Sequence, residues 1–199
     1  MSLNVEAVFS EAPEARTIEL HELLASLRLP DGRLSADWLA TITEALAARP
    51  DLFEDLLVDV AAERRWFQLY LTECFEVRLL TWDREQTSDW HDHGGSSGAC
   101  SVTAGELYEA FRAPDHVSVF DRHLRAGDQG SFGPDHVHDV IFEAGNPAVS
   151  IHAYSPPLNG VTVYDRTQFG YVARDFVLEE RRAEQPLVGG PPRLGHQGE

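Results

Sequence analysis

The sequence predicts a mainly β fold, either a sandwich or a small barrel, with helices packed against it. Three observations lead to this prediction. The first third of the chain places apolar residues at helical spacing, the part from about residue 67 consists of short β-type runs broken by turn residues, and 199 residues can bury one substantial core. We therefore expect a single domain over 1–199, with a helical region at 15–65 and the β region at 67–175.

The N-terminal region contains three groups of apolar residues, each at the spacing of one helix face. The turn signal Pro30-Asp31-Gly32 separates the first two groups, Pro50 ends the second, and Asp51 with Glu54 resembles a capping pair for the third. The groups are Leu20, Leu23, Leu24 and Leu27; Leu39, Ile42 and Leu46; and Phe53, Leu56, Leu57 and Val60.

The β region is recognised by its short runs of β-branched and aromatic residues, separated by Gly, Pro, Asp and Asn. Many such runs at close spacing are typical of a sandwich or small barrel, whose mouth can hold a ligand. The tail at 180–199 has little to bury, and we expect it to be flexible. The runs are FEVRLLTW, ACSVTAGELYE, HVSVF, HDVIF, AVSIHAY and GVTVY.

Composition excludes several classes of partner. The formal net charge of −17 repels phosphate backbones and anionic lipids, so we expect neither nucleic acid nor a membrane as a partner. Cys74 and Cys100 are too few for a disulfide framework, and the start MSLNVEAVFSEAPEARTIEL lacks the pattern of a signal peptide. No stretch is long and apolar enough to cross a bilayer. These features predict a cytoplasmic protein.

The stretch WHDHGGSSGAC contains the first candidate metal ligands. In a strand, His91 and His93 would share one face, with Asp92 directed away, so the two imidazoles could bind one metal ion. Imidazole suits iron, zinc, copper and nickel, so the pair does not identify the metal. A pair of surface or core histidines without a ligand is the alternative interpretation.

A third ligand is offered by the downstream run PDHVHDVIF, which contains His136 and His138. No Asp or Glu follows His93 within the next few residues, so the metal would be held by neutral imidazoles alone. Iron with three neutral ligands keeps its double positive charge and three open positions, which favours an anionic, chelating substrate together with O2. A thiolate with a neighbouring amine has this chemistry.

The run SIHAY has one polar and one apolar face. Ser150, His152 and Tyr154 alternate with apolar residues, and a barrel wall would turn Val149 and Ile151 outward against helices. The polar face could be a hydrogen-bonded ladder that only satisfies buried groups. Alternatively it lies beside a metal, with a tyrosine hydroxyl that supplies a proton or a hydrogen bond.

Taken together, these motifs resemble the cysteine dioxygenase family, iron-dependent thiol dioxygenases of the cupin superfamily, and its bacterial members in particular. The resemblance covers roughly 50–175 and rests on H-D-H at 91–93, H-x-V at His138, SIHAYSPP at 150–157 and VTVYD at 161–165. It implies a cupin-type small β-barrel or jelly roll with N-terminal helices packed against it.

The resemblance also implies which residues form the site. Fe(II) would be held by His91, His93 and His138, and His138 is preferred to His136 because the family's third ligand lies two residues before a valine. Counting back from the H-D-H motif places the family's substrate-carboxylate arginine at Arg65, whose guanidinium fork fits a carboxylate. The alternative for Arg65 is a solvated charge at the end of a helix.

Two positions depart from the mammalian pattern. Gly98 stands where those members have a cysteine crosslinked to the tyrosine of the Ser-x-His-x-Tyr strand, so Tyr154 should be an uncrosslinked phenol. Cys100 is a poor substitute, and we interpret it as an ordinary buried thiol. Glu63 replaces a tyrosine two residues before the arginine, which leaves the shape of the carboxylate pocket open.

The implied activity adds both atoms of O2 to the sulfur of L-cysteine and gives cysteine sulfinic acid. Tyr154 would donate a hydrogen bond to bound oxygen or to the substrate amine, while His152, steadied by Ser150, would hold Tyr154 and Arg65 in place. One alternative is a dioxygenase for 3-mercaptopropionate or another small thiol. The other is a non-catalytic cupin that binds a metal or small ligand. The native thiol and the oligomeric state stay open.

Overall fold

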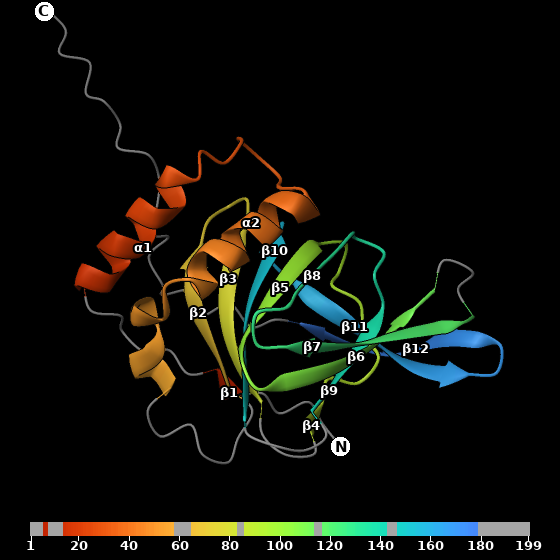
Figure 1. Cartoon of the computed structure of the whole chain (residues 1–199). Helices are drawn as coiled ribbons and strands as arrows, with labels where there is room; N and C mark the ends of the chain where they lie inside the picture. Colours follow the sequence, from red (N-terminus) through yellow and green to blue (C-terminus); the bar gives the residue numbers. More distant parts are fainter. Residues whose placement is uncertain are drawn as a thin grey trace, which may run out of the picture.

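The computed structural model describes residues 6–7, 14–57, 65–82, 86–113, 117–142 and 147–178 (Figure 1). The tail expected at 180–199 lies outside these described residues. Within them the helices precede the strands, as the sequence predicts, except for the two-residue strand at Glu6–Ala7, which comes before the first helix. The prediction of a mainly β fold with N-terminal helices is therefore confirmed.

Two α-helices and two short 3₁₀ helices form the helical part. They are α1 (Glu14–Ser26), α2 (Ala36–Ala47), η1 (Pro50–Leu52) and η2 (Glu54–Leu57). The third predicted helix is replaced, in its described part, by the two 3₁₀ turns, because the chain bends after Pro50 and buries Leu52 and Phe53 within a few residues. No helix among the described residues is long and apolar enough to cross a bilayer.

The strands form three sheets. The six-stranded sheet has the order β1-β2-β3-β10-β5-β8, the four-stranded sheet β4-β9-β6-β7, and the last sheet is the hairpin β11-β12. Their bounds are β1 Glu6–Ala7, β2 Arg65–Leu71, β3 Glu76–Trp82, β4 Gln86–Thr87, β5 Ser97–Ala104, β6 Glu106–Arg112, β7 Val119–Arg125, β8 Gln129–Phe132, β9 His138–Phe142, β10 Ala148–Ser155, β11 Gly160–Thr167 and β12 Gly170–Leu178. The hydrogen bonds among the described residues do not close these sheets into one continuous barrel.

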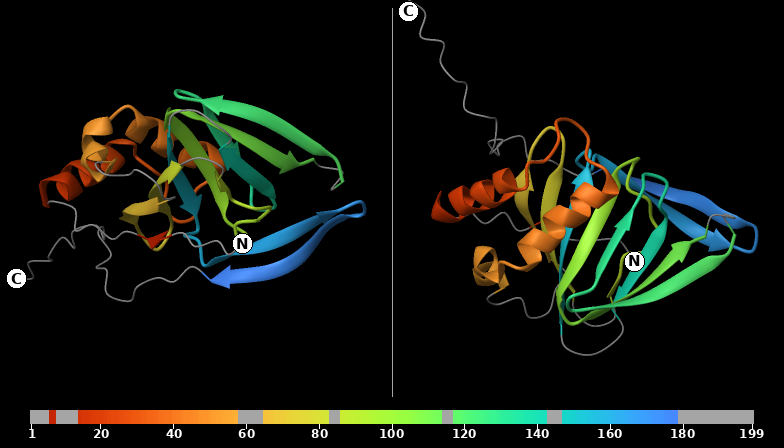
Figure 2. Two further views of the ribbon diagram at one scale, coloured as in Figure 1. Left: turned by 90° about the horizontal axis from the view of Figure 1, so that it is seen from below. Right: turned by 45° about the horizontal axis from the view of Figure 1, so that its top comes forward.

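The six-stranded sheet separates two parts of the core. Figures 1 and 2 show the helices on one side of this sheet and the β6–β7 and β11–β12 hairpins on the other. On the helix side, Ile42 and Leu46 of α2 belong to one cluster with Val149 and Ile151 of β10, which is the outward packing predicted for that strand. The interior side holds a second cluster around Trp82 of β3. The central strands are thus buried on both faces.

The packing of α2 predicts a large difference between two isoleucines that both lie in helices. Ile42 is fully buried against the sheet, whereas Ile18 of α1 is 53% exposed. Ile42→Ala should lower the free energy of unfolding by about 2–5 kcal/mol because it leaves a cavity. Ile18→Ala should change it by less than about 0.5 kcal/mol. Urea denaturation measures both, and equal losses would contradict the packing of α2 on the sheet.

Candidate metal centre

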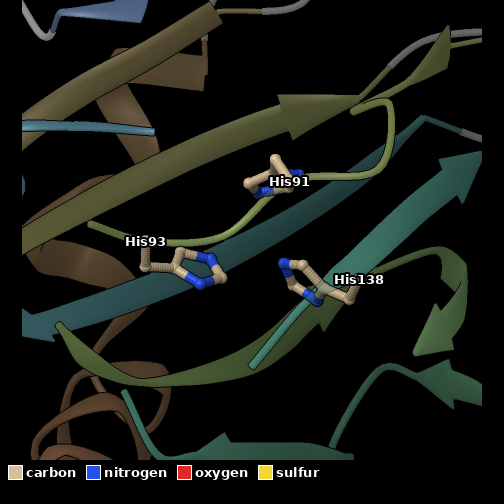
Figure 3. A group of neighbouring side chains, drawn as sticks. All are labelled: His91, His93 and His138. Atoms are coloured by element: carbon tan, nitrogen blue, oxygen red, sulfur yellow. The ribbon is translucent and has the colours of Figure 1, made fainter. Parts of the chain in front are cut away.

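Three histidines from two separate segments meet at one point in the interior (Figure 3). His91 and His93 lie in the segment before β5, and His138 is the first residue of β9. One ring nitrogen from each can be chosen such that all three lie within 4.8 Å of one another. The ring centroids are 4.7 Å apart for His91 and His138, 4.9 Å for His93 and His138, and 5.0 Å for His91 and His93.

The H-D-H motif lies in an irregular segment rather than in the regular strand that its spacing suggested. His91 forms isolated bridges to His138 of β9 and Val163 of β11, so it joins two sheets at a single residue. Asp92 is directed away from the histidines, as predicted, and accepts hydrogen bonds from the Gly94 and Thr162 N–H groups at 3.0 and 2.9 Å. These contacts outweigh the effect of burial and lower the pKa of Asp92.

A tight turn after His93 brings the two histidines into position. Gly94 and Gly95 have φ angles of 58° and 84°, in the left-handed region that favours glycine. A Cβ atom at Gly94 would lie 2.6 Å from the carbonyl oxygen of Gly160. The glycine-rich run after the motif is therefore required by backbone geometry and by a close approach to β11.

The ring nitrogens of the three histidines fit a metal ion. The Nδ1–H of His91 donates to the carbonyl of Asp89 at 2.9 Å, so the lone pair of this neutral ring is on Nε2. His93 is 2% exposed, and neither of its ring nitrogens has a hydrogen-bond partner among the described residues. Burial lowers the pKa of His93 well below its ordinary value, so the ring is neutral. A buried nitrogen without a partner is costly, and a metal bond would satisfy it.

Glu109 of β6 is a buried carboxylate that the sequence analysis did not single out. It accepts hydrogen bonds from His138 Nδ1 at 2.7 Å, His136 Nε2 at 3.1 Å and Arg122 Nε at 2.5 Å. Burial opposes its charge, but these contacts lower its pKa well below the ordinary value, so it is ionised. The sequence offered one signal for a buried Glu109. In the strand ELYEAFR alternate residues share a face, so Glu109 lies on the same face as the apolar Leu107.

The contacts of Glu109 also help to decide whether His136 or His138 is the third metal ligand. His136 and His138 form a second possible metal group with Glu109, but only His138 also lies close to both His91 and His93. By accepting the Nδ1 proton of His138, the carboxylate leaves the lone pair of this ring on Nε2. Both carboxylate oxygens of Glu109 are already used by three donors, which favours the group of three histidines as the metal site.

The polar face of β10 forms a continuous hydrogen-bonded chain. Trp82 Nε1–H donates to Ser150 Oγ at 2.9 Å, Ser150 Oγ lies 2.9 Å from His152 Nε2, and His152 Nδ1 lies 3.1 Å from Tyr154 Oη. Indole can only donate, so Ser150 Oγ accepts from Trp82 and its own proton is left for another acceptor, for which His152 Nε2 lies at 2.9 Å. The neutral ring then carries its proton on Nδ1 and donates it to the Tyr154 oxygen.

Tyr154 lies next to the three histidines. Its ring centroid is 5.5 Å from that of His93. Gly98 is its partner across the β10–β5 pair, and a Cβ atom at Gly98 would lie 2.3 Å from the Phe132 ring. Phe132 thus fills the space that a side chain at position 98 would need. Cys100 is a buried thiol, and burial raises its pKa to about 12.

Arg65 is the first residue of β2 and pairs with Thr81, so it begins a strand rather than ending a helix. Its side chain, like the whole of Glu63, lies outside the described residues. The role of Arg65 in binding a carboxylate therefore stays a prediction.

Comparison with known proteins identifies a family. A family model described as cysteine dioxygenase type I matches residues 34–167, while no curated protein matches the chain. A solved double-stranded β-helix protein from Klebsiella pneumoniae is 20% identical, with a TM-score of 0.43 over 51% of this chain and 84% of that one. BH2720 from Bacillus halodurans is 18% identical, with a TM-score of 0.45 over 53% of this chain and 78% of that one. An oxalate oxidase is 15% identical, with a TM-score of 0.42 over 45% of each chain, so the match spans less than half of that protein.

The Glu109 contact predicts that this carboxylate tunes metal affinity. Glu109→Gln removes the charge that orients His138 and should weaken metal binding by about 10–100-fold. Glu106→Gln, on the same strand but exposed, is the matched control and should leave the affinity unchanged. Competition with a chromophoric chelator measures both. Equal affinities of the two variants would contradict the orienting role of Glu109.

The close packing of the Phe132 ring against Gly98 predicts that a larger side chain at position 98 lowers the stability of the protein. Gly98→Cys would force the Phe132 ring to move and should cost about 1–3 kcal/mol of unfolding free energy. Gly133→Cys is the control because a Cβ atom there meets nothing within 4 Å, and its effect should stay below about 0.5 kcal/mol. Chemical denaturation under reducing conditions compares the two variants. An unchanged unfolding free energy for Gly98→Cys would show that the Phe132 ring does not fill the space beside position 98.

Proposed function

The chain belongs to the cysteine dioxygenase type I family, and from this premise we propose that it is an iron-dependent dioxygenase whose substrate is L-cysteine. In the proposed reaction both atoms of O2 are added to the sulfur, which gives cysteine sulfinic acid. The family supports a metal-dependent dioxygenase that uses a small thiol and O2. Iron and L-cysteine are the finer parts of the proposal.

The observation that carries the proposal is the state of His93. Its two buried nitrogens have no hydrogen-bond partner among the described residues, and His91 and His138 lie close enough to complete a three-histidine site. A set of three neutral imidazoles suits Fe(II) among other metals. Bound there, Fe(II) would supply a redox-active ion with open positions for a thiolate, an amine and O2.

The protein residues around this site would then orient and polarise the reactants. Glu109 holds the His138 ring in one tautomer and makes it a stronger ligand. The low pKa of His93 keeps it unprotonated and able to bind a metal. His93 and His138 are buried and His91 is half-buried, so little water reaches the inner side of the group, which strengthens electrostatic interactions with a bound substrate there.

Tyr154 is proposed to donate a hydrogen bond to the reacting groups. Because its oxygen accepts the Nδ1 proton of His152, its own proton is directed to a different partner. The contacts of Trp82 and Ser150 favour this polarity, since the indole N–H can only donate to Ser150 Oγ and the Ser150 proton is then left for His152 Nε2. Ser150 and His152 are therefore positioning residues, and Tyr154 is the member that would contact substrate or oxygen.

Dioxygen consumption by the Fe(II)-loaded protein tests the proposed function. With L-cysteine we expect turnover, and mass spectrometry with labelled O2 should find both labelled oxygen atoms in the sulfinate product. A strong preference for 3-mercaptopropionate would instead assign the alternative thiol. Absence of turnover with either thiol, at full iron occupancy, would leave a protein that only binds a metal or ligand.

Removal of the Tyr154 hydroxyl tests how much this residue contributes to the rate of the proposed reaction. Tyr154→Phe should lower kcat by about 10²–10³-fold, as expected for the loss of a donor to developing charge, while iron content stays unchanged. Tyr70→Phe is the matched control, because the Tyr70 hydroxyl contacts His21 at 3.1 Å and its ring packs in the helix-side cluster. Equal kcat values for the two variants would show that the Tyr154 hydroxyl takes no part in the reaction.

A further inference from the structure

A cavity of about 470 Å³ opens beside the metal centre, between β6, β7 and the segment at 131–136. Phe111 and Phe120, which line it, pair across β6 and β7, and Glu109 pairs with Arg122 two residues further along. Residues two apart in a strand share a face, so the cavity lies on the face that carries Glu109. The described residues of its wall include neither Tyr154 nor the three histidines, so it is separate from the proposed substrate site.

Two rings separate this cavity from the metal centre. Phe132 and His136 both line the cavity, and their ring centroids lie 4.6 Å apart in a stacked arrangement. The Phe132 centroid lies 4.5 Å from that of His93, and the His136 centroid lies 4.8 Å from that of His138. A molecule in the cavity would therefore contact neighbours of the metal ligands without reaching the metal itself.

Two arginines supply hydrogen-bond donors to the cavity wall. Arg122 Nε donates to Glu109, but among the described residues its Nη1 and Nη2 have no hydrogen-bond or ion-pair partner, and its side chain is 32% exposed. Arg112 Nη2 donates to the backbone carbonyl of Asp135 at 2.7 Å. Asp135 is the one acidic residue of the described wall, so guanidinium groups outnumber carboxylates there, although the net charge of the protein is −17. Such donors favour an anionic partner.

Aromatic rings form the apolar part of the same wall. The Phe111 and Phe120 rings meet edge to face with centroids 5.8 Å apart, and Phe120 is 53% exposed. Cζ of Arg122 lies 5.5 Å from the centre of the Phe111 ring, so the cationic and apolar surfaces adjoin. A cavity that combines exposed aromatic surface with a few polar groups is typical of a site for a small organic molecule.

We propose that this cavity binds a small organic anion with an apolar body and that the bound anion strengthens metal binding. The anion would accept hydrogen bonds from the Nη groups of Arg122, whose Nε stays on Glu109. Part of the positive charge that offsets Glu109 would then be shared with the ligand. Glu109 accepts from His138 Nδ1, so the more negative potential would reach a metal ligand and favour a bound cation. This role goes beyond the proposed reaction and does not depend on which thiol is oxidised.

The first test compares small molecules that share only part of the proposed chemistry. Benzoate has a carboxylate and an apolar ring, benzamide lacks the charge, and acetate lacks the ring. Isothermal titration calorimetry of the metal-free, full-length protein prevents the carboxylate from binding a metal ion instead. We expect a Kd for benzoate of about 1 mM or lower, and binding of the other two at least about 10-fold weaker. Equal affinities for benzoate and benzamide, or no binding of benzoate, would overturn the proposal.

Substitutions in the wall locate the bound benzoate. Gly133 lines the cavity, and a Cβ atom there meets nothing within 4 Å, so Gly133→Glu and Gly133→Gln should both fold. The added carboxylate should weaken benzoate binding by about 10-fold or more relative to the glutamine, since only the charge differs. Arg112→Met should weaken it by about 10-fold, whereas Arg125→Met, which alters a 70% exposed arginine outside the cavity, should not. Unchanged affinity in both Gly133→Glu and Arg112→Met would overturn the proposed site.

A second measurement tests the link to the metal. Competition with a chromophoric chelator under argon should find that saturating benzoate strengthens Fe(II) binding by about 5–10-fold, and the loaded protein should bind benzoate more tightly by the same factor. Gly133→Glu should abolish this effect. Benzoate binding without any change in Fe(II) affinity would overturn the link, and an effect that persists in Gly133→Glu would show direct binding of benzoate to iron and overturn it as well. Neither readout needs turnover, so failure of the proposed reaction would leave the result intact.

Discussion

The period of two along β10 is the constraint on which both the fold and the candidate site depend. This strand is hydrogen-bonded on both edges and buried on both faces, so every residue must suit one of two environments. Ile151 and its apolar neighbours supply the hydrophobic contact with α2, while His152 and its polar neighbours face the interior. The apolar face stabilises a sheet whose other face is free to carry chemistry.

Burial of polar groups on the interior side requires that each one finds a partner. Glu109 satisfies this through three donors, and the chain from Trp82 to Tyr154 satisfies it through successive hydrogen bonds. His93 differs from these groups, since its ring nitrogens have no hydrogen-bond partner within the described part of the chain. A metal ion would correct this and would stabilise the folded state by mass action, which couples metal binding to folding.

The interior also shows how the chain adapts to positions where it departs from the mammalian pattern. Gly98 lies opposite Tyr154, and the Phe132 ring occupies the adjacent space, so the tyrosine is packed by an aromatic contact instead of a side chain from β5. Arg78 of β3, the cross-strand partner of His152, adds a charge that is balanced by Glu76. These residues adjust the surroundings of the site without altering the three histidines.

The sequence by itself determined the alternation of the strands, the clustering of candidate metal ligands in two short motifs and the family resemblance, because periodicity and spacing are local properties. It did not determine which residues meet across strands. Glu109 contacts His138 from 29 positions away, and the segment that holds His91 lies outside any regular strand. The described part of the third expected helix, up to Leu57, forms 3₁₀ turns for a similar reason, since packing of Leu52 and Phe53 overrode local periodicity. A sequence pattern shows which face a side chain occupies, but only the pairing of distant strands decides what that face meets.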